Sequence, residues 1–147
     1  MALPAEQVSE PFEWTDSYRL GIPGVDQEHR TFFALVRAIE VSVAEQDGLG
    51  VREAMRNLRL YAETHFAHEE EFLEAVGYPD LPRHRAEHAE FMRDVTVLEA
   101  TPGLPTVVAV RMARAWIGQH ILGTDRRYTR WLDETDALPQ VSYPGPA

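Results

Sequence analysis

The stretch VREAMRNLRLYAETHFAHEEEFLEAV, residues 51–76, decides the fold of this chain. Its apolar residues recur mainly every three or four positions, at Val51, Met55, Leu58, Ala62, Phe66, Phe72 and Leu73. Side chains with this spacing lie on one face of an α-helix, so the stretch predicts an amphipathic helix. Residues that break helices bound it on both sides, with GLG at 48–50 and GYPDLP at 77–82.

Three further segments show the same apolar spacing. They are separated by two more breaker clusters, GIPG at 21–24 and TPGLP at 101–105. No segment alternates between apolar and polar residues for long, as a half-buried strand would. Four helices joined by short loops predict an all-α fold, an antiparallel up-down-up-down four-helix bundle. Asp26, just after the GIPG turn, is expected to cap the first of these helices.

The two ends of the chain differ from the bundle in composition. Residues 11–22, PFEWTDSYRLGI, are too apolar for a free tail, so we expect an N-terminal arm packed on the bundle. Residues 1–10 and 134–147 are polar or rich in proline, and we expect both to be loosely ordered. The sequence therefore predicts a single domain over residues 1–147, with a core at about 12–132.

Composition excludes several classes of function. The chain has 147 residues, and 14 Lys and Arg against 24 Asp and Glu give a net charge of −10, which argues against nucleic-acid binding. No apolar run approaches the roughly 20 residues that span a bilayer, and no export signal is evident, so we expect a cytoplasmic protein. No protein partner is indicated. The absence of cysteine leaves only nitrogen and oxygen ligands for any metal.

Five of the six histidines and two acidic residues fall in register with the apolar faces of the predicted helices. They are His29, His65, Glu69, His84, His88, His120 and Asp125. Residues four apart differ by only about 40° around a helix, so His65 and Glu69 project together, as do His84 and His88. Burying these groups without partners would cost several kcal/mol each, so the pattern favours a metal site inside the bundle.

The number of candidate ligands indicates more than one metal ion. These seven side chains exceed the three or four protein ligands of a tetrahedral zinc site. Two octahedral ions accommodate them if both carboxylates bridge and an oxide or hydroxide also bridges. One position then stays open for a small exogenous ligand. A nitrogen-rich site with carboxylate bridges suits iron, although affinity alone would also admit copper or zinc.

The order and spacing of these residues resemble the hemerythrin signature, specifically that of bacterial hemerythrins. The phrases LGIPGVDQEH, HFAHEE, GYPDLPRH and HILGTDRRY are similar to that family as well, and the resemblance covers about residues 12–132. It implies a protein that binds dioxygen reversibly, without being an enzyme. The cofactor would be two iron ions with a bridging oxide or hydroxide, held without haem in a four-helix bundle.

The resemblance also implies a role for each candidate residue. His84, His88 and His120 would hold the six-coordinate iron. His29 and His65 would hold the iron with the open position. Glu69 and Asp125 would bridge the two ions, and Ile121 would wall the oxygen pocket.

Two histidines need separate treatment. His120 and Asp125 are five apart, which on a regular helix separates them by about 140°. Both can face one site only if the helix is locally underwound, so we predict a π-helical turn, made easier by Gly123. His68 points away from His65 and is expected to be a partly exposed side chain near Glu69 or Glu71, outside the ligand set.

Other functions fit the residues less well. The segment 84–88 matches the H-x-x-E-H zinc peptidase pattern, but its glutamate lies off the histidine face and five inward ligands stay unexplained. A ferritin-like oxidase needs Glu-x-x-His pairs, which the sequence lacks. Sensing of oxygen or redox state through a partner, or a peroxidase-like or iron-handling activity, stays an alternative. An apolar wall at Ile121 favours binding over turnover, because it offers no general acid or base.

Overall fold

The computed structural model describes residues 12–101, 106–136 and 141–146. These ranges contain helices and no strand. The elements are η1 (Asp16–Tyr18), α2 (Pro23–Ala44), α3 (Gly48–Val76), α4 (Leu81–Ala100), α5 (Thr106–Gln119), η2 (His120–Asp125) and α6 (Arg126–Thr135). The last three follow one another directly, so together they form the fourth long helix.

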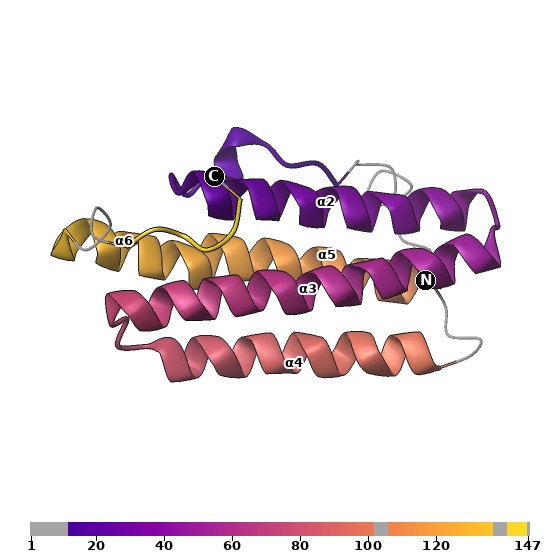
Figure 1. The fold of residues 1–147 in the computed structure, drawn as a ribbon. Coiled ribbons are helices and arrows are strands. Elements are labelled where there is room, and N and C mark those ends of the chain that lie inside the picture. The colour runs from indigo at the N-terminus through magenta and orange to yellow at the C-terminus, as the bar shows by residue number, and fades with distance from the viewer. Residues whose placement is uncertain (1–11, 102–105, 137–140, 147) are drawn as a thin grey trace.

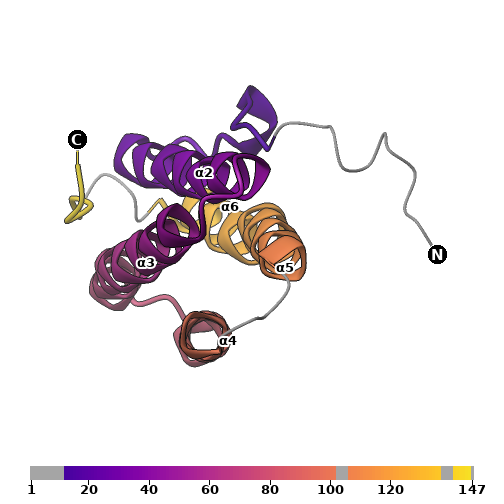
Figure 2. The ribbon, with the colours of Figure 1, turned by 90° about the vertical axis from the view of Figure 1, so that its right-hand side faces the viewer.

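The four long helices lie side by side along their lengths (Figure 1). The view along their axes shows them around a common centre, with α6 behind α5 (Figure 2). Helix α2 packs on α3 and on α5, and α3 packs on α4. Because each helix turns back on the one before it, the arrangement is antiparallel, and the predicted up-down-up-down bundle is confirmed.

Helix α3, the stretch from which the fold was predicted, is capped at both ends. At its start the Asp47 carboxylate accepts a hydrogen bond of 3.0 Å from the backbone N–H of Gly50. At its end Gly77 has a φ of 74°, a left-handed conformation that glycine adopts without strain. The backbone N–H of Tyr78 then donates to the carbonyl of Leu73. These caps end α3 on both sides, so the chain can reverse direction sharply where it joins the neighbouring helices.

The expected role of Asp26 as the cap of the first helix is wrong. Helix α2 begins at Pro23, whose ring suits the first helical turn, so Asp26 lies inside the helix. Its buried carboxylate instead reaches back to the preceding turn. It accepts hydrogen bonds from the backbone N–H groups of Leu20 and Gly21, at 2.8 and 3.1 Å. Asp26 thus fixes the arm to the start of α2.

Asp26→Ala is expected to lower the free energy of unfolding by about 1–2 kcal/mol, because two backbone donors lose their acceptor. Urea unfolding followed by circular dichroism measures this change. Gln27→Ala is the matched control, since Gln27 is exposed on the same turn. Equal stability of the two variants would contradict the role given to Asp26.

The N-terminal arm packs on the bundle over its described residues, 12–22, as predicted. The Phe12 ring is buried and stacks on Phe33, with 4.2 Å between the ring centroids. The guanidinium of Arg30 lies over the Trp14 ring at 4.1 Å. The arm therefore covers the outer face of α2 (Figure 1).

The C-terminal segment has more contacts than a loosely ordered tail would make. We expected loose order over residues 134–147, but Glu134 and Thr135 belong to α6. Val141 and Tyr143 pack against a buried apolar cluster. Residues 1–10, also expected to be loose, lie outside the described residues, as do 137–140 and Ala147.

Two apolar clusters fill the bundle. The larger contains residues such as Val36, Leu58 and Val95. The smaller lies at the other end and contains Ile22, Val25, Phe72, Leu73, Leu81, Tyr128 and Leu132. Along the chain, the candidate ligands on α2 and α4 fall between the two clusters, whereas on α3 and the fourth helix Phe66 and Ile121 of the larger cluster lie among them. The candidate site is therefore closed by apolar packing on both sides.

Candidate metal centre

All seven candidate ligands are buried, and none is more than 5% exposed. His29 comes from α2, His65 and Glu69 from α3, His84 and His88 from α4, and His120 and Asp125 from η2. The bundle therefore brings together, in one interior region, residues that lie almost a hundred positions apart. Their side chains divide into two groups.

The first group contains three histidines around one oxygen of Glu69. The Oε1 atom of Glu69 lies 2.6 Å from Nε2 of His84, 3.0 Å from Nε2 of His88 and 3.9 Å from Nε2 of His120. These four side chains offer donor atoms within 4.8 Å of one another, close enough to surround one metal ion.

The second group contains His29 and His65, and it also uses Glu69. The Nε2 atom of His65 lies 3.8 Å from the other Glu69 oxygen, Oε2. His29, His65 and Glu69 form a second set of donors that could hold a metal ion. Glu69 thus turns one oxygen toward each group, which is the arrangement of a bridging carboxylate.

Asp125 shows the same division between the two groups. Its Oδ2 atom lies 3.1 Å from Nε2 of His29. Its Oδ1 atom lies 3.3 Å from Nε2 of His84 and 3.2 Å from Nε2 of His120. Asp125 and Glu69 therefore both stand between the two groups of histidines.

The predicted π-helical turn is confirmed, and it covers His120–Asp125. The turn contains about one residue more than a turn of α-helix, which brings residues five apart onto one face. Gly123 is not needed for space, because a Cβ there would meet no described atom within 4 Å. The turn therefore brings His120 and Asp125 together without a steric need for glycine.

Three acidic residues that sequence reasoning missed hold the outer nitrogens of the histidines. Nδ1 of His65 lies 3.1 Å from Glu28, Nδ1 of His88 lies 2.9 Å from Glu70, and Nδ1 of His120 lies 3.1 Å from Glu87. Such partners orient an imidazole and leave its Nε2 lone pair for a metal. Each acid directly adjoins a candidate ligand along the chain or follows the same helix face, a signal that could have found them.

One phenol also contacts the candidate bridge. The buried Tyr128 hydroxyl donates a hydrogen bond of 3.1 Å to Oε2 of Glu69. It fixes the orientation of the carboxylate that both groups share. The sequence does not predict this contact, because the apolar spacing of the fourth helix marks Tyr128 only as a core position.

The carboxylates and imidazoles shift one another's pKa values. Burial would raise the pKa of Glu69, but His84 and the neighbouring imidazoles hold it well below its usual range. Burial would lower the pKa of His84, but the Glu69 and Asp125 carboxylates raise it to about 9. The carboxylates therefore stay ionised, and the histidines face concentrated negative charge that attracts a cation.

The donor set fits two metal ions. Among the described residues, the Nε2 atom of His29 and both oxygens of Asp125 are buried yet lack a well-oriented hydrogen bond. Such atoms are stable in a protein interior when they bind a metal. Imidazole nitrogen and carboxylate oxygen together suit iron.

Comparison with known proteins agrees with this donor set. The family described as the hemerythrin HHE cation binding domain matches residues 20–132. This chain belongs to the hemerythrin family. The family description names cation binding, which fits the two groups of histidine and carboxylate donors in this hemerythrin.

Curated relatives of this hemerythrin match most of its length. Bacteriohemerythrin of Clostridium acetobutylicum is 31% identical over 128 residues, which cover 80% of this chain and 98% of the relative. Myohemerythrin of Theromyzon tessulatum is 28% identical over 122 residues, which cover 83% of this chain and 94% of the relative. A solved structure of a leucine-to-phenylalanine mutant has a TM-score of 0.65 and 26% identity, and covers 80% of this chain and 93% of that chain.

Ile121 lies beside the candidate hemerythrin site. Its side chain is only 2% exposed and lines a cavity of about 10 Å³ together with His29, His65 and His120. This volume is about the space that one water molecule needs. The cavity adjoins both groups of histidines.

The sixth histidine of the hemerythrin chain has a different partner from the one expected. His68 is partly exposed, as predicted, but its Nδ1 atom lies 2.7 Å from Oε2 of Glu28 rather than beside Glu69 or Glu71. Glu28 thus contacts both His65 and His68. His68 stays outside the set of candidate ligands.

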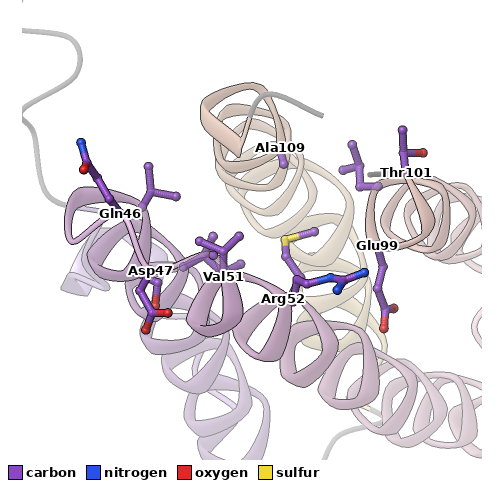
Figure 3. Close-up of a pocket in the computed structure, with 13 residues that line it drawn as sticks. Gln46, Asp47, Val51, Arg52, Glu99, Thr101 and Ala109 are labelled. Atoms are coloured by element: carbon purple, nitrogen blue, oxygen red, sulfur yellow. The ribbon is translucent and has the colours of Figure 1, made fainter. Parts of the chain in front are cut away.

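A larger pocket lies at the far end of the hemerythrin bundle (Figure 3). Its volume is about 600 Å³, and Gln46, Asp47, Val51, Arg52 and Glu99 are among its lining residues. None of the seven candidate ligands lines it, so it is separate from the candidate metal centre.

Across the described residues, no helix combines the length and apolar character needed to cross a membrane.

Proposed function

We propose that this hemerythrin binds dioxygen reversibly at a non-haem di-iron centre with a bridging oxide or hydroxide, for oxygen carriage, storage or delivery. The observation that carries the proposal is the pair of shared carboxylates. Glu69 and Asp125 each turn one oxygen toward the group of His84 and His120, and the other toward the group of His29 and His65. A site for a single metal ion needs no such division.

The proposed roles follow from these two groups. His84, His88 and His120 would hold one iron, and His29 and His65 would hold the other. Glu69 and Asp125 would each offer one oxygen to either ion. When bound, the iron pair supplies the redox chemistry that dioxygen binding needs.

The rest of the cavity supports binding over turnover. Apart from candidate ligands, its lining consists of Phe32, Phe66, Trp116, Ile117 and Ile121. These side chains offer no general acid or base at the position where the small ligand would fit. They exclude water from that position instead, which favours release of the ligand unchanged.

Iron and haem analysis together with oxygen uptake tests the proposal. We expect two irons per chain, no haem, and oxygen uptake by the reduced protein that an argon purge reverses. One metal per chain, or stoichiometric zinc after expression in iron-replete cells, would contradict the di-iron centre. Steady consumption of hydrogen peroxide with a reducing substrate would instead favour a peroxidase-like activity.

A further inference from the structure

Glu28 is a buried carboxylate that three side chains contact at once. It is 1% exposed. His65 Nδ1 lies 3.1 Å from its Oε1 atom, and His68 Nδ1 lies 2.7 Å from its Oε2 atom. The third partner is Tyr143, whose hydroxyl donates a hydrogen bond to Oε1. One oxygen of Glu28 is therefore shared by a candidate ligand and by the C-terminal segment.

The segment 141–146 is closely fitted to the start of α2, to which it returns after α6 (Figure 1). A Cβ atom on Gly24 would lie 2.4 Å from the carbonyl oxygen of Pro146 and 2.6 Å from the Tyr143 ring. Helix α2 thus admits the segment only because position 24 has no side chain. The Tyr143 ring packs on Phe72, with 5.5 Å between centroids, so its hydroxyl is held in place by its own packing.

The contact between Glu28 and His65 decides which nitrogen of His65 faces the candidate metal position. An imidazole offers its Nε2 lone pair when Nδ1 carries the proton and donates it to a partner. Here Glu28 accepts at Nδ1, and Nε2 points toward Glu69. Tyr143 donates to the same Glu28 oxygen, so it holds that oxygen beside His65 while His68 contacts the other one.

We propose that Tyr143 is a positioning residue of the metal centre, which acts through Glu28 to hold His65 with its Nε2 atom toward the metal position. The identity of the metal rests on the proposed function above. The chain of contacts from Tyr143 to His65 does not depend on that identity, so it can be tested by itself.

Tyr143→Phe removes the hydroxyl and keeps the ring. In the iron-loaded protein, we expect one of the two irons to pass to a ferrous chelator about tenfold faster than in the parent, with the other unchanged. This difference in rate between the two irons distinguishes positioning of His65 from a general loosening of the protein, which would accelerate the loss of both irons equally. Equal acceleration of both, or no acceleration, would overturn the proposal.

Nitrogen-edited NMR of protein prepared without metal gives an independent readout. We expect the His65 Nδ1 proton to be protected from solvent exchange in the parent and to exchange faster in Tyr143→Phe. Gly24→Ala should have the same effect, because its methyl group displaces the segment without removing a polar group. Unchanged exchange in both variants would overturn the proposal, even if the parent failed to bind two irons and the proposed function were wrong.

Two further variants complete the design. In a Glu28→Gln background, Tyr143→Phe should add nothing to the rate of iron loss, since an effect that acts through Glu28 is not additive. Full additivity would overturn the route through Glu28. Tyr18→Phe is the matched control, because Tyr18 is a half-buried tyrosine of the arm whose ring packs on Phe33 of α2. It should leave both readouts at parent values.

Discussion

Replacing Glu69 with alanine is expected to remove both iron ions from the protein. Its Oε1 atom lies 2.6 Å from His84, in one group of ligands, and its Oε2 atom faces His65 in the other. Under the proposed roles, one substitution would therefore take a ligand from each ion, whereas His29→Ala would take a ligand from only one. We expect Glu69→Ala to retain less than about a tenth of the parent's iron, and His29→Ala clearly more. Elemental analysis after gel filtration measures both.

Asp125→Ala should resemble Glu69→Ala, because the two Asp125 oxygens face different groups. Metal binding is also folding free energy for a site assembled from several helices, so the melting temperature of both variants should fall. Glu71→Ala is the control, since this acid is exposed on α3 two residues beyond Glu69. Equal iron retention by the two bridge variants and by His29→Ala would show that the carboxylates do not bridge.

Ile121→Ala is expected to keep two irons and yet to lose reversible oxygen uptake several-fold faster than the parent. The side chain is buried beside the small cavity and is not itself a ligand. Its truncation costs about 2–4 kcal/mol of stability and enlarges the cavity. Water then approaches the ligand position and supplies protons, so more of each oxygenation ends in oxidised protein.

Repeated cycles of oxygenation and argon purging, followed by absorbance, measure this loss for Ile121→Ala. Leu122→Ala is the control, because Leu122 belongs to the same π-helical turn but is 40% exposed and does not line the cavity. It should behave as the parent does. An unchanged rate in Ile121→Ala with a full iron count would remove Ile121 from the wall of the site, and with it the main support for binding over turnover.

The helices and the gathering of the candidate ligands could be predicted from sequence because both depend on spacing along one helix. His65 and Glu69 lie four apart, and so do His84 and His88, and helical geometry alone places each pair on one face. The π-helical turn followed from the same reasoning, because residues five positions apart, such as His120 and Asp125, do not share one face of an α-helix. The roles of the individual ligands, the bounds of the domain and the cytoplasmic location stay predictions.

Each supporting acid adjoins a candidate ligand in the sequence, but the partner it contacts could not be predicted, because these contacts join distant parts of the chain. Glu28 meets His65 37 residues later, and Tyr143 meets Glu28 across 115 residues. No periodic pattern marks such a pair, and a tyrosine among prolines is typical of a loose tail. The prediction that Asp26 caps the helix was wrong for a related reason. Its carboxylate accepts hydrogen bonds from the backbone that precedes the helix rather than from the first helical turn.

The π-helical turn also lets the fourth helix contain an extra residue without turning its buried side chains away from the core. One such turn is geometrically equal to a turn of α-helix with one residue inserted. The buried residues Ala113 and Ile117 before it and Tyr128 and Leu132 after it therefore keep a common direction, although the helix contains an extra residue between them. An insertion in a regular helix would rotate everything beyond it by about 100°. Here the six-residue turn absorbs that rotation, so the buried residues before and after it share one core although the helix contains the extra residue.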